Sequence, residues 1–172
     1  MEQKIKSEIL QSFPPLANSR TKILVIGTMP GVASLEAAQY YAHPRNAFWK
    51  IIAQVFNNGA EFQSYQEKIN CALAHGIGLW DNLQNCIREG SLDSNIKNAV
   101  PNDFETLLAH HHINKLLFNG QKSFEFFKRY HGKLLETTAF ETMPSTSPAN
   151  ATISFEKKMA IWQKALIIQN IN

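Results

Sequence analysis

Apolar and polar residues alternate along the chain in blocks that predict strands separated by helices. Residues 22–27 (KILVIG) form a short, β-branched apolar run that ends at a glycine, which is typical of a buried parallel strand. Residues 115–119 (KLLFN) and 134–140 predict two further strands. The glycine-bracketed apolar segment 76–80 (GIGLW) belongs beside them.

The segments between these strands have helical spacing. Apolar side chains at 48, 51, 52, 55 and 56 predict an amphipathic helix over 47–56. Other helices are expected up to Phe13, near 62–74, from Asn102 or Asp103 to about 111, over 121–131 ended by Gly132, and over 154–169. Residues 28–45 predict an irregular segment with at most a short turn near 34–38. Strands that alternate with helices indicate an α/β fold, a three-layer α/β/α sandwich around a short parallel sheet.

Composition adds limits to this picture. The 172 residues, 44% hydrophobic and 18% charged, suit a single globular domain over residues 1–172. A net charge of +3 is compatible with a polyanionic partner. Cys71 and Cys86 lie too far apart in the chain for a Cys-x-x-Cys pair, so an iron–sulfur or four-thiolate zinc site is excluded. No apolar run has the length of a membrane span, and we expect a cytoplasmic protein.

Three segments that carry candidate chemistry follow or lie between the predicted strands, and ligands of open parallel sheets bind at the carboxyl ends of the strands. The first segment, 27–31 (GTMPG), is either an ordinary turn or a glycine-flanked loop whose backbone approaches a base or phosphate. The second, 40–49 (YYAHPRNAFW), places Asn46 as an N-cap that can also hold a water or a base edge. The third, 143–150 (MPSTSPAN), is either a surface loop or a phosphate-binding loop.

Taken together, GTMPG, YAHPRNAFW and PSTSPAN resemble the motifs of the uracil-DNA glycosylase superfamily. The resemblance is closest to its mismatch-specific branch and its hypoxanthine-DNA (deoxyinosine) glycosylase branch. Residues 76–81 (GIGLWD) and 88–94 (REGSLDS) resemble the hypoxanthine branch in particular. The resemblance covers about residues 22 to 152 and implies the fold of that superfamily.

The resemblance also implies roles for individual residues. Family members commonly have Asn or Asp in the first motif to position the hydrolytic water, where this chain has Met29, whose thioether is a poor acceptor. Members of the hypoxanthine branch lack that residue too and use the asparagine of the second motif, so the resemblance implies Asn46 as the catalytic residue. Asp81 is the second candidate, as the carboxylate beside a predicted strand end in a matching motif. The expected base-binding residues are Thr28, Met29, Pro30, Gly31, Tyr41 (stacking on the base) and His43. The expected DNA-binding residues are Ser145, Thr146, Ser147, Pro148, Ala149 and Asn150, with 146–149 as a wedge in the vacated stack.

The implied activity is that of a monofunctional DNA glycosylase in base excision repair. It would hydrolyse the N-glycosidic bond of a deaminated base, hypoxanthine or uracil, flipped out of DNA. We expect no cofactor, no metal and no membrane partner, and a monomer; His110–His112 are expected to form a solvated helix end. Two alternatives stay open at this stage: a non-catalytic DNA-binding relative, and a hydrolase of a small nucleotide.

Overall fold

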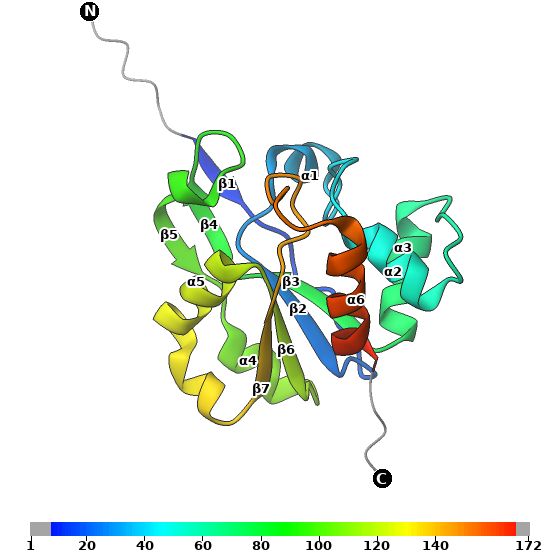
Figure 1. Ribbon diagram of the computed structural model, residues 1–172. Helices are drawn as coiled ribbons and strands as arrows, with labels where there is room; N and C mark the ends of the chain where they lie inside the picture. The colour runs from blue at the N-terminus through cyan, green and yellow to red at the C-terminus, as the bar shows by residue number, and fades with distance from the viewer. Residues whose placement is uncertain (1–7, 168–172) are drawn as a thin grey trace, which may run out of the picture.

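Residues 8–167 are described by the computed structural model, in which a four-stranded parallel sheet lies between two groups of helices (Figure 1). Its strands are β2 (Ile23–Gly27), β3 (Ile77–Asp81), β6 (Lys115–Asn119) and β7 (Ala139–Met143), in the order β3-β2-β6-β7. All three pairings are parallel, so the four carboxyl ends meet at one edge. The sandwich predicted from the sequence is confirmed.

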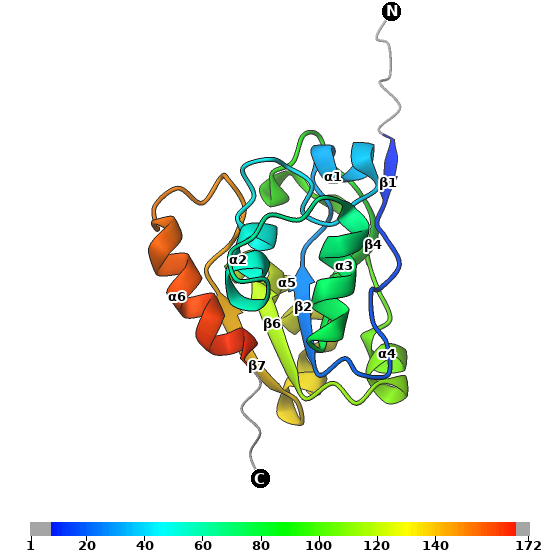
Figure 2. The same ribbon diagram turned by 90° about the vertical axis from the view of Figure 1, so that its right-hand side faces the viewer.

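Helices cover both faces of this sheet. They are α1 (Val32–Ala37), α2 (Phe48–Phe56), α3 (Tyr65–Ala74), α4 (Phe104–His110), α5 (Gln121–His131) and α6 (Phe155–Leu166). Figure 2 shows α2, α3 and α6 in front of the sheet, with α5 behind it. Among residues 8–167, no helix has the length and apolar character that a membrane span requires.

The alternation of side chains along β2 explains the two layers of core. Val25 packs with buried residues of α2, α3 and α6 on one face. Leu24 and Ile26 point the other way, toward residues of α4 and α5 such as Phe104 and Phe127. Both faces of the strand are buried, and this accounts for its continuous apolar sequence.

A second, antiparallel sheet was not predicted. It has the order β1-β4-β5 and consists of β1 (Ile9–Gln11), β4 (Leu83–Ile87) and β5 (Lys97–Pro101). The predicted helix up to Phe13 is therefore wrong over the described residues, because Ile9–Gln11 pair with β4. The β4–β5 connection contains a 3₁₀ turn, Asp93–Asn95, and rises to the same end of the molecule as α1 and the loop after β7 (Figure 1).

Two predicted boundaries near the end of the chain are also corrected. The strand expected over 134–140 is instead a 3₁₀ helix, Gly132–Glu136, followed by β7 at Ala139–Met143. Gly132 continues the chain with a helical φ of −53° and does not end α5 in a left-handed turn. The final helix ends at Leu166, and residues 168–169 of the expected helix lie outside the described residues.

Candidate active site

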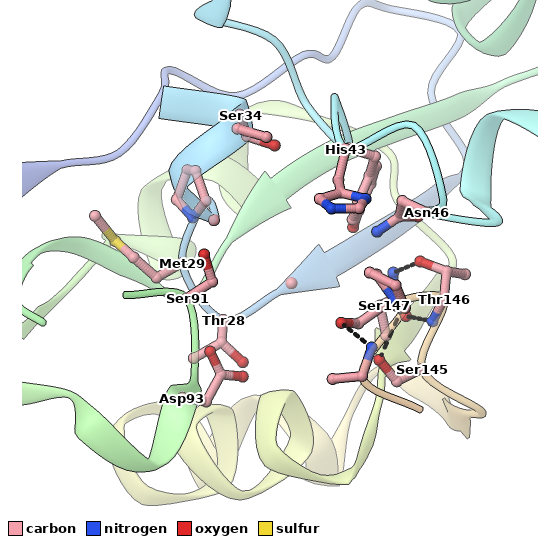
Figure 3. Close-up of a pocket in the computed structure, with 18 of the residues that line it drawn as sticks. Thr28, Met29, Ser34, His43, Asn46, Ser91, Asp93, Ser145, Thr146 and Ser147 are labelled. Atoms are coloured by element: carbon pink, nitrogen blue, oxygen red, sulfur yellow. Dashed lines mark hydrogen bonds between the residues drawn. The ribbon is translucent and has the colours of Figure 1, made fainter. Parts of the chain in front are cut away.

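A cavity of about 420 Å³ lies at the carboxyl ends of the parallel strands. Loops that are distant in sequence form its wall, and Figure 3 shows the segment of Ser91 and Asp93 facing that of Ser145–Ser147 across it. Every site residue predicted from the sequence lines this one cavity: Thr28, Met29, Pro30, Gly31, Tyr41, His43, Asn46, Asp81, Ser145, Thr146, Ser147, Pro148, Ala149 and Asn150. The structure thus brings the three motifs together, while the roles of their residues stay predictions.

Hydrogen bonds join the second and third motifs. The Ala47 N–H donates to the Thr146 carbonyl at 3.0 Å. Asn119, the last residue of β6, exchanges two 2.9 Å hydrogen bonds with Thr146: Nδ2 donates to Oγ1, and Oδ1 accepts from the backbone N–H. Thr146 is consequently buried at 1% exposure and supports the loop from inside.

The first motif is held by a buried arginine. Arg88 donates through Nη2 to the Pro30 carbonyl at 2.6 Å and through Nε to the Gly90 carbonyl at 2.8 Å. The Val32 N–H also donates to Ser91 Oγ at 2.9 Å. The Arg88–Pro30 and Val32–Ser91 bonds thus fix the first motif and the start of α1 against the β4–β5 connection, and the Arg88–Gly90 bond holds that connection in place.

One of the two polar atoms of the Asn46 side chain already makes a hydrogen bond within the protein. Its Oδ1 accepts from the Phe48 N–H at 2.9 Å, which satisfies a free donor at the start of α2. This bond identifies the oxygen, so Nδ2 is the free end, and Figure 3 shows it directed toward the cavity. Asn46 therefore presents hydrogen-bond donors to a ligand, which suits a base carbonyl or the oxygen of a water molecule.

Tyr41 and His43 lie on the same loop. Tyr41 has a left-handed backbone with φ of 55°, unusual for a bulky residue. Its ring packs against Phe48 with centroids 4.3 Å apart, and its buried hydroxyl has no hydrogen-bond partner among the described residues. His43 Nδ1 accepts from the Arg45 N–H at 3.1 Å, so Nε2 is the nitrogen that can face a ligand.

Asp81 is the buried carboxylic acid of the site. It is 4% exposed, and Oδ2 has no hydrogen-bond partner within the described part of the chain. Burial and, to a smaller extent, the charge of Asp93 raise the pKa of Asp81, and the charge of Arg88 lowers it; together they place this pKa at about 7. A carboxyl group that titrates near neutral pH inside a cavity can exchange protons with a bound water or base.

Gly27 makes room for this carboxyl group. A methyl group on Gly27 would overlap Oδ1 of Asp81 and approach the Tyr41 hydroxyl at 3.5 Å. Gly27→Ala is therefore expected to displace the carboxyl group and to lower the glycosylase activity that the sequence resemblance implies by more than tenfold. Single-turnover assays on duplex DNA with one deaminated base measure this change. Gly132→Ala is the matched control, because a methyl group there meets no atom within 4 Å and should leave the rate unchanged.

Met29 contributes to the wall mainly through the backbone. Its side chain is 7% exposed and packs in a small apolar cluster with Leu83, Cys86 and Phe126. Figure 3 shows it pointing away from His43 and Asn46. The side chain thus anchors the first motif to β4 and α5.

The sequence prediction missed several residues of the wall: Ser34, Tyr40, Ser91, Leu92, Asp93 and Asn119. Asn119 carries the same signal as Asp81, a polar residue at the end of an apolar strand, and could have been found by that rule. The segment 91–93 lies within residues 88–94, whose resemblance to the hypoxanthine branch was the available signal. Its place at the cavity was missed because the antiparallel pairing of β4 with β5 was not predicted.

The whole of this architecture has counterparts among known proteins. Residues 14–167 match the family model of the uracil DNA glycosylase superfamily. Two proteins named hypoxanthine DNA glycosylase are each 33% identical to the chain. The one from Methanosarcina barkeri aligns over 90% of this chain and 96% of its own length, and the one from Methanosarcina acetivorans over 85% and 91%.

A solved structure has the same fold. The solution NMR structure of a proposed uracil DNA glycosylase from Methanosarcina acetivorans superposes with a TM-score of 0.79 at 30% identity. It covers 92% of this chain and 97% of that one. On this match of sequence motifs, fold and nearly full length, the chain belongs to the uracil DNA glycosylase superfamily.

Proposed function

We propose that the protein is a monofunctional DNA glycosylase that hydrolyses the N-glycosidic bond of hypoxanthine flipped out of DNA, with uracil as a second substrate. The observation that carries the proposal is the single cavity in which Asn46 Nδ2 and the Asp81 carboxyl group both lie at the ends of the parallel strands. The resemblance of 76–81 and 88–94 to the hypoxanthine branch, and the names of the two archaeal relatives, favour hypoxanthine over uracil.

A base extruded into the cavity can reach the free amide group of Asn46. The two amide hydrogens of Asn46 can donate to a base carbonyl, and both hypoxanthine and uracil carry one next to a ring N–H. As the glycosidic bond breaks, negative charge develops on the departing base, and a fixed donor stabilises that charge. We therefore assign Asn46 to the leaving base.

The proposed reaction needs a second group that accepts a proton from the attacking water, because Asn46 cannot do so. Its oxygen already accepts from the Phe48 N–H, and a neutral carboxamide is too weak a base to take a proton from water. Asp81, with an unpartnered Oδ2 and a pKa of about 7, is the group that can accept this proton. In the proposed reaction water attacks C1′, its proton passes to the Asp81 carboxylate, and the bonding electrons leave with the base.

The proposed enzyme releases the base without cleaving the DNA strand. A bifunctional glycosylase needs an amine nucleophile, and among the described residues no lysine lines the cavity. The expected product is an intact strand with an abasic site.

The test uses duplex oligonucleotides with one hypoxanthine or one uracil, with undamaged duplex as the control. Wild-type protein should give strand breaks only after alkali treatment, and faster with hypoxanthine. Breaks without alkali would contradict the monofunctional assignment, and binding without any breaks would indicate the non-catalytic relative.

A competition experiment separates DNA from a small substrate. Neutralisation of phosphates makes DNA binding fall steeply with salt, whereas a compact nucleotide makes few such contacts. Undamaged duplex should inhibit the reaction more strongly at 50 mM than at 200 mM salt, and free inosine monophosphate should compete poorly. Strong competition by the free nucleotide would favour the small-nucleotide hydrolase.

A further inference from the structure

The mouth of the cavity has two unlike lips. The acidic lip, residues 89–95, belongs to the β4–β5 connection and includes Glu89 and Asp93. The polar lip, residues 145–150, has small, uncharged side chains and no carboxylate. DNA phosphates are repelled by the first and accepted by the second, so a strand that enters the cavity runs along the polar lip. The acidic lip then faces the bases.

Leu92 is the apolar residue of the acidic lip. Its side chain is 56% exposed, and it lines the cavity. The other strongly exposed large apolar side chains of the described chain do not line it: Ile9, Val32, Val100, Phe140, Ile161 and Ile167. Leucine is one of the apolar side chains that DNA-binding proteins insert between bases, and Leu92 has this side chain exposed at the rim of the cavity.

The lip that carries Leu92 is firmly supported. The Leu92 carbonyl accepts a hydrogen bond from the Asn95 N–H at 3.0 Å, and this bond begins the 3₁₀ turn. Asn95 Nδ2 donates to the Glu89 carbonyl at 3.2 Å, and Arg88 holds the adjoining Gly90 carbonyl. The side chain is thus presented on a fixed backbone, as insertion between bases requires.

The polar lip is less suited to that task. Thr146, the first residue of the expected wedge 146–149, is buried and bonded to Asn119. Ala149 is exposed but carries only a methyl group. Neither can fill the space that a nucleotide leaves in a base stack, and Pro148, the apolar residue between them, is half-buried in the loop.

We propose that Leu92 inserts into the base stack of duplex DNA at the position left by the extruded nucleotide. This rests on the proposed function, because it concerns the duplex from which the base is taken. Insertion of an apolar side chain offsets the stacking lost on extrusion and keeps the nucleotide from returning. A single-stranded substrate has no vacated stack, so Leu92 should matter little there.

The test compares variants on the same hypoxanthine-containing sequence as duplex and as single strand. Leu92→Ala should lower the single-turnover rate of base release on duplex by about tenfold or more, because the extruded nucleotide returns to the stack more readily when no side chain fills its place. On single strand its rate should stay within about twofold of wild type. Leu92→Met should restore the duplex rate, and Val100→Ala, an exposed apolar residue of the same hairpin, should match wild type on both.

A second readout does not depend on chemistry. A 2-aminopurine placed beside the target base in duplex should brighten when wild-type protein unstacks it, and should brighten much less with Leu92→Ala. Equal signals, or equal rate losses on duplex and single strand, overturn the role of Leu92. If wild-type protein releases no base from either substrate, the proposed function fails, and the fluorescence comparison alone decides the role of Leu92.

Discussion

Replacement of Asp81 by asparagine is expected to lower the rate of base release by about 10²- to 10⁴-fold, the usual contribution of a general base. The substitution keeps the shape of the side chain and removes the group proposed to accept the proton. For wild-type protein, kcat/KM should rise with pH and level off above about 7, because only the ionised carboxylate accepts a proton. The variant should show a flat, low profile.

Asp93→Asn is the matched control for this profile. Asp93 also lines the cavity, and its charge raises the pKa of Asp81. Its removal should shift the midpoint of the profile to lower pH and leave most of the plateau rate. An Asp81→Asn variant that keeps the wild-type rate and profile would contradict the assignment of the base.

Asp81→Asn should also stabilise the folded protein. The pKa of Asp81 is about 7 when folded, against an ordinary value near 4, so between these values the folded state binds the extra proton. Wild-type stability should therefore fall as pH rises from about 4 to 7. Asp81→Asn should raise the free energy of unfolding at pH 8, by up to about 4 kcal/mol, and much less at pH 4. Urea denaturation at both pH values measures this difference.

Replacement of Asn46 by alanine is expected to lower kcat by about 10²- to 10³-fold, as the loss of one fixed donor to a developing anion does. It also removes the bond from the Phe48 N–H and should cost about 1 kcal/mol of stability. Single-turnover rates and urea denaturation separate the two effects.

Asn46→Asp isolates the donor. The carboxylate keeps an acceptor for the Phe48 N–H, so stability should stay near wild type, but the Nδ2 donors are gone. Activity should fall as far as in the alanine variant. An aspartate variant with wild-type activity would show that Asn46 serves only to start α2.

The gathering of the motifs could be predicted because it follows from parallel strands. Both β2 and β6 are short apolar runs, so they could be recognised as strands from their composition. Parallel strands bring their carboxyl ends to the same edge of a sheet. The segment that follows Gly27 and the segment that ends just before Gly120 therefore had to lie at one edge. Gly120, with φ of +98°, lets Ser145 approach closely there.

The antiparallel sheet could not be predicted because its strands are short and half exposed. β4 and β5 mix polar and apolar residues without a clear period, and β1 is three residues long. Pairing between Ile9 and Ile87 is a long-range contact that local spacing does not reveal. For this reason Ser91, Leu92 and Asp93 were absent from the predicted site. The sequence could not show either that Asn46 Oδ1 accepts from the Phe48 N–H, because this hydrogen bond depends on the folded structure.

The most direct measurement is a structure of the Asp81→Asn variant bound to a duplex with one hypoxanthine. We predict that the base lies in the cavity, with a carbonyl oxygen within hydrogen-bonding distance of Asn46 Nδ2 and phosphates along residues 145–150. A complex in which the hypoxanthine stays stacked in the duplex, or occupies another surface of the protein, would contradict the account.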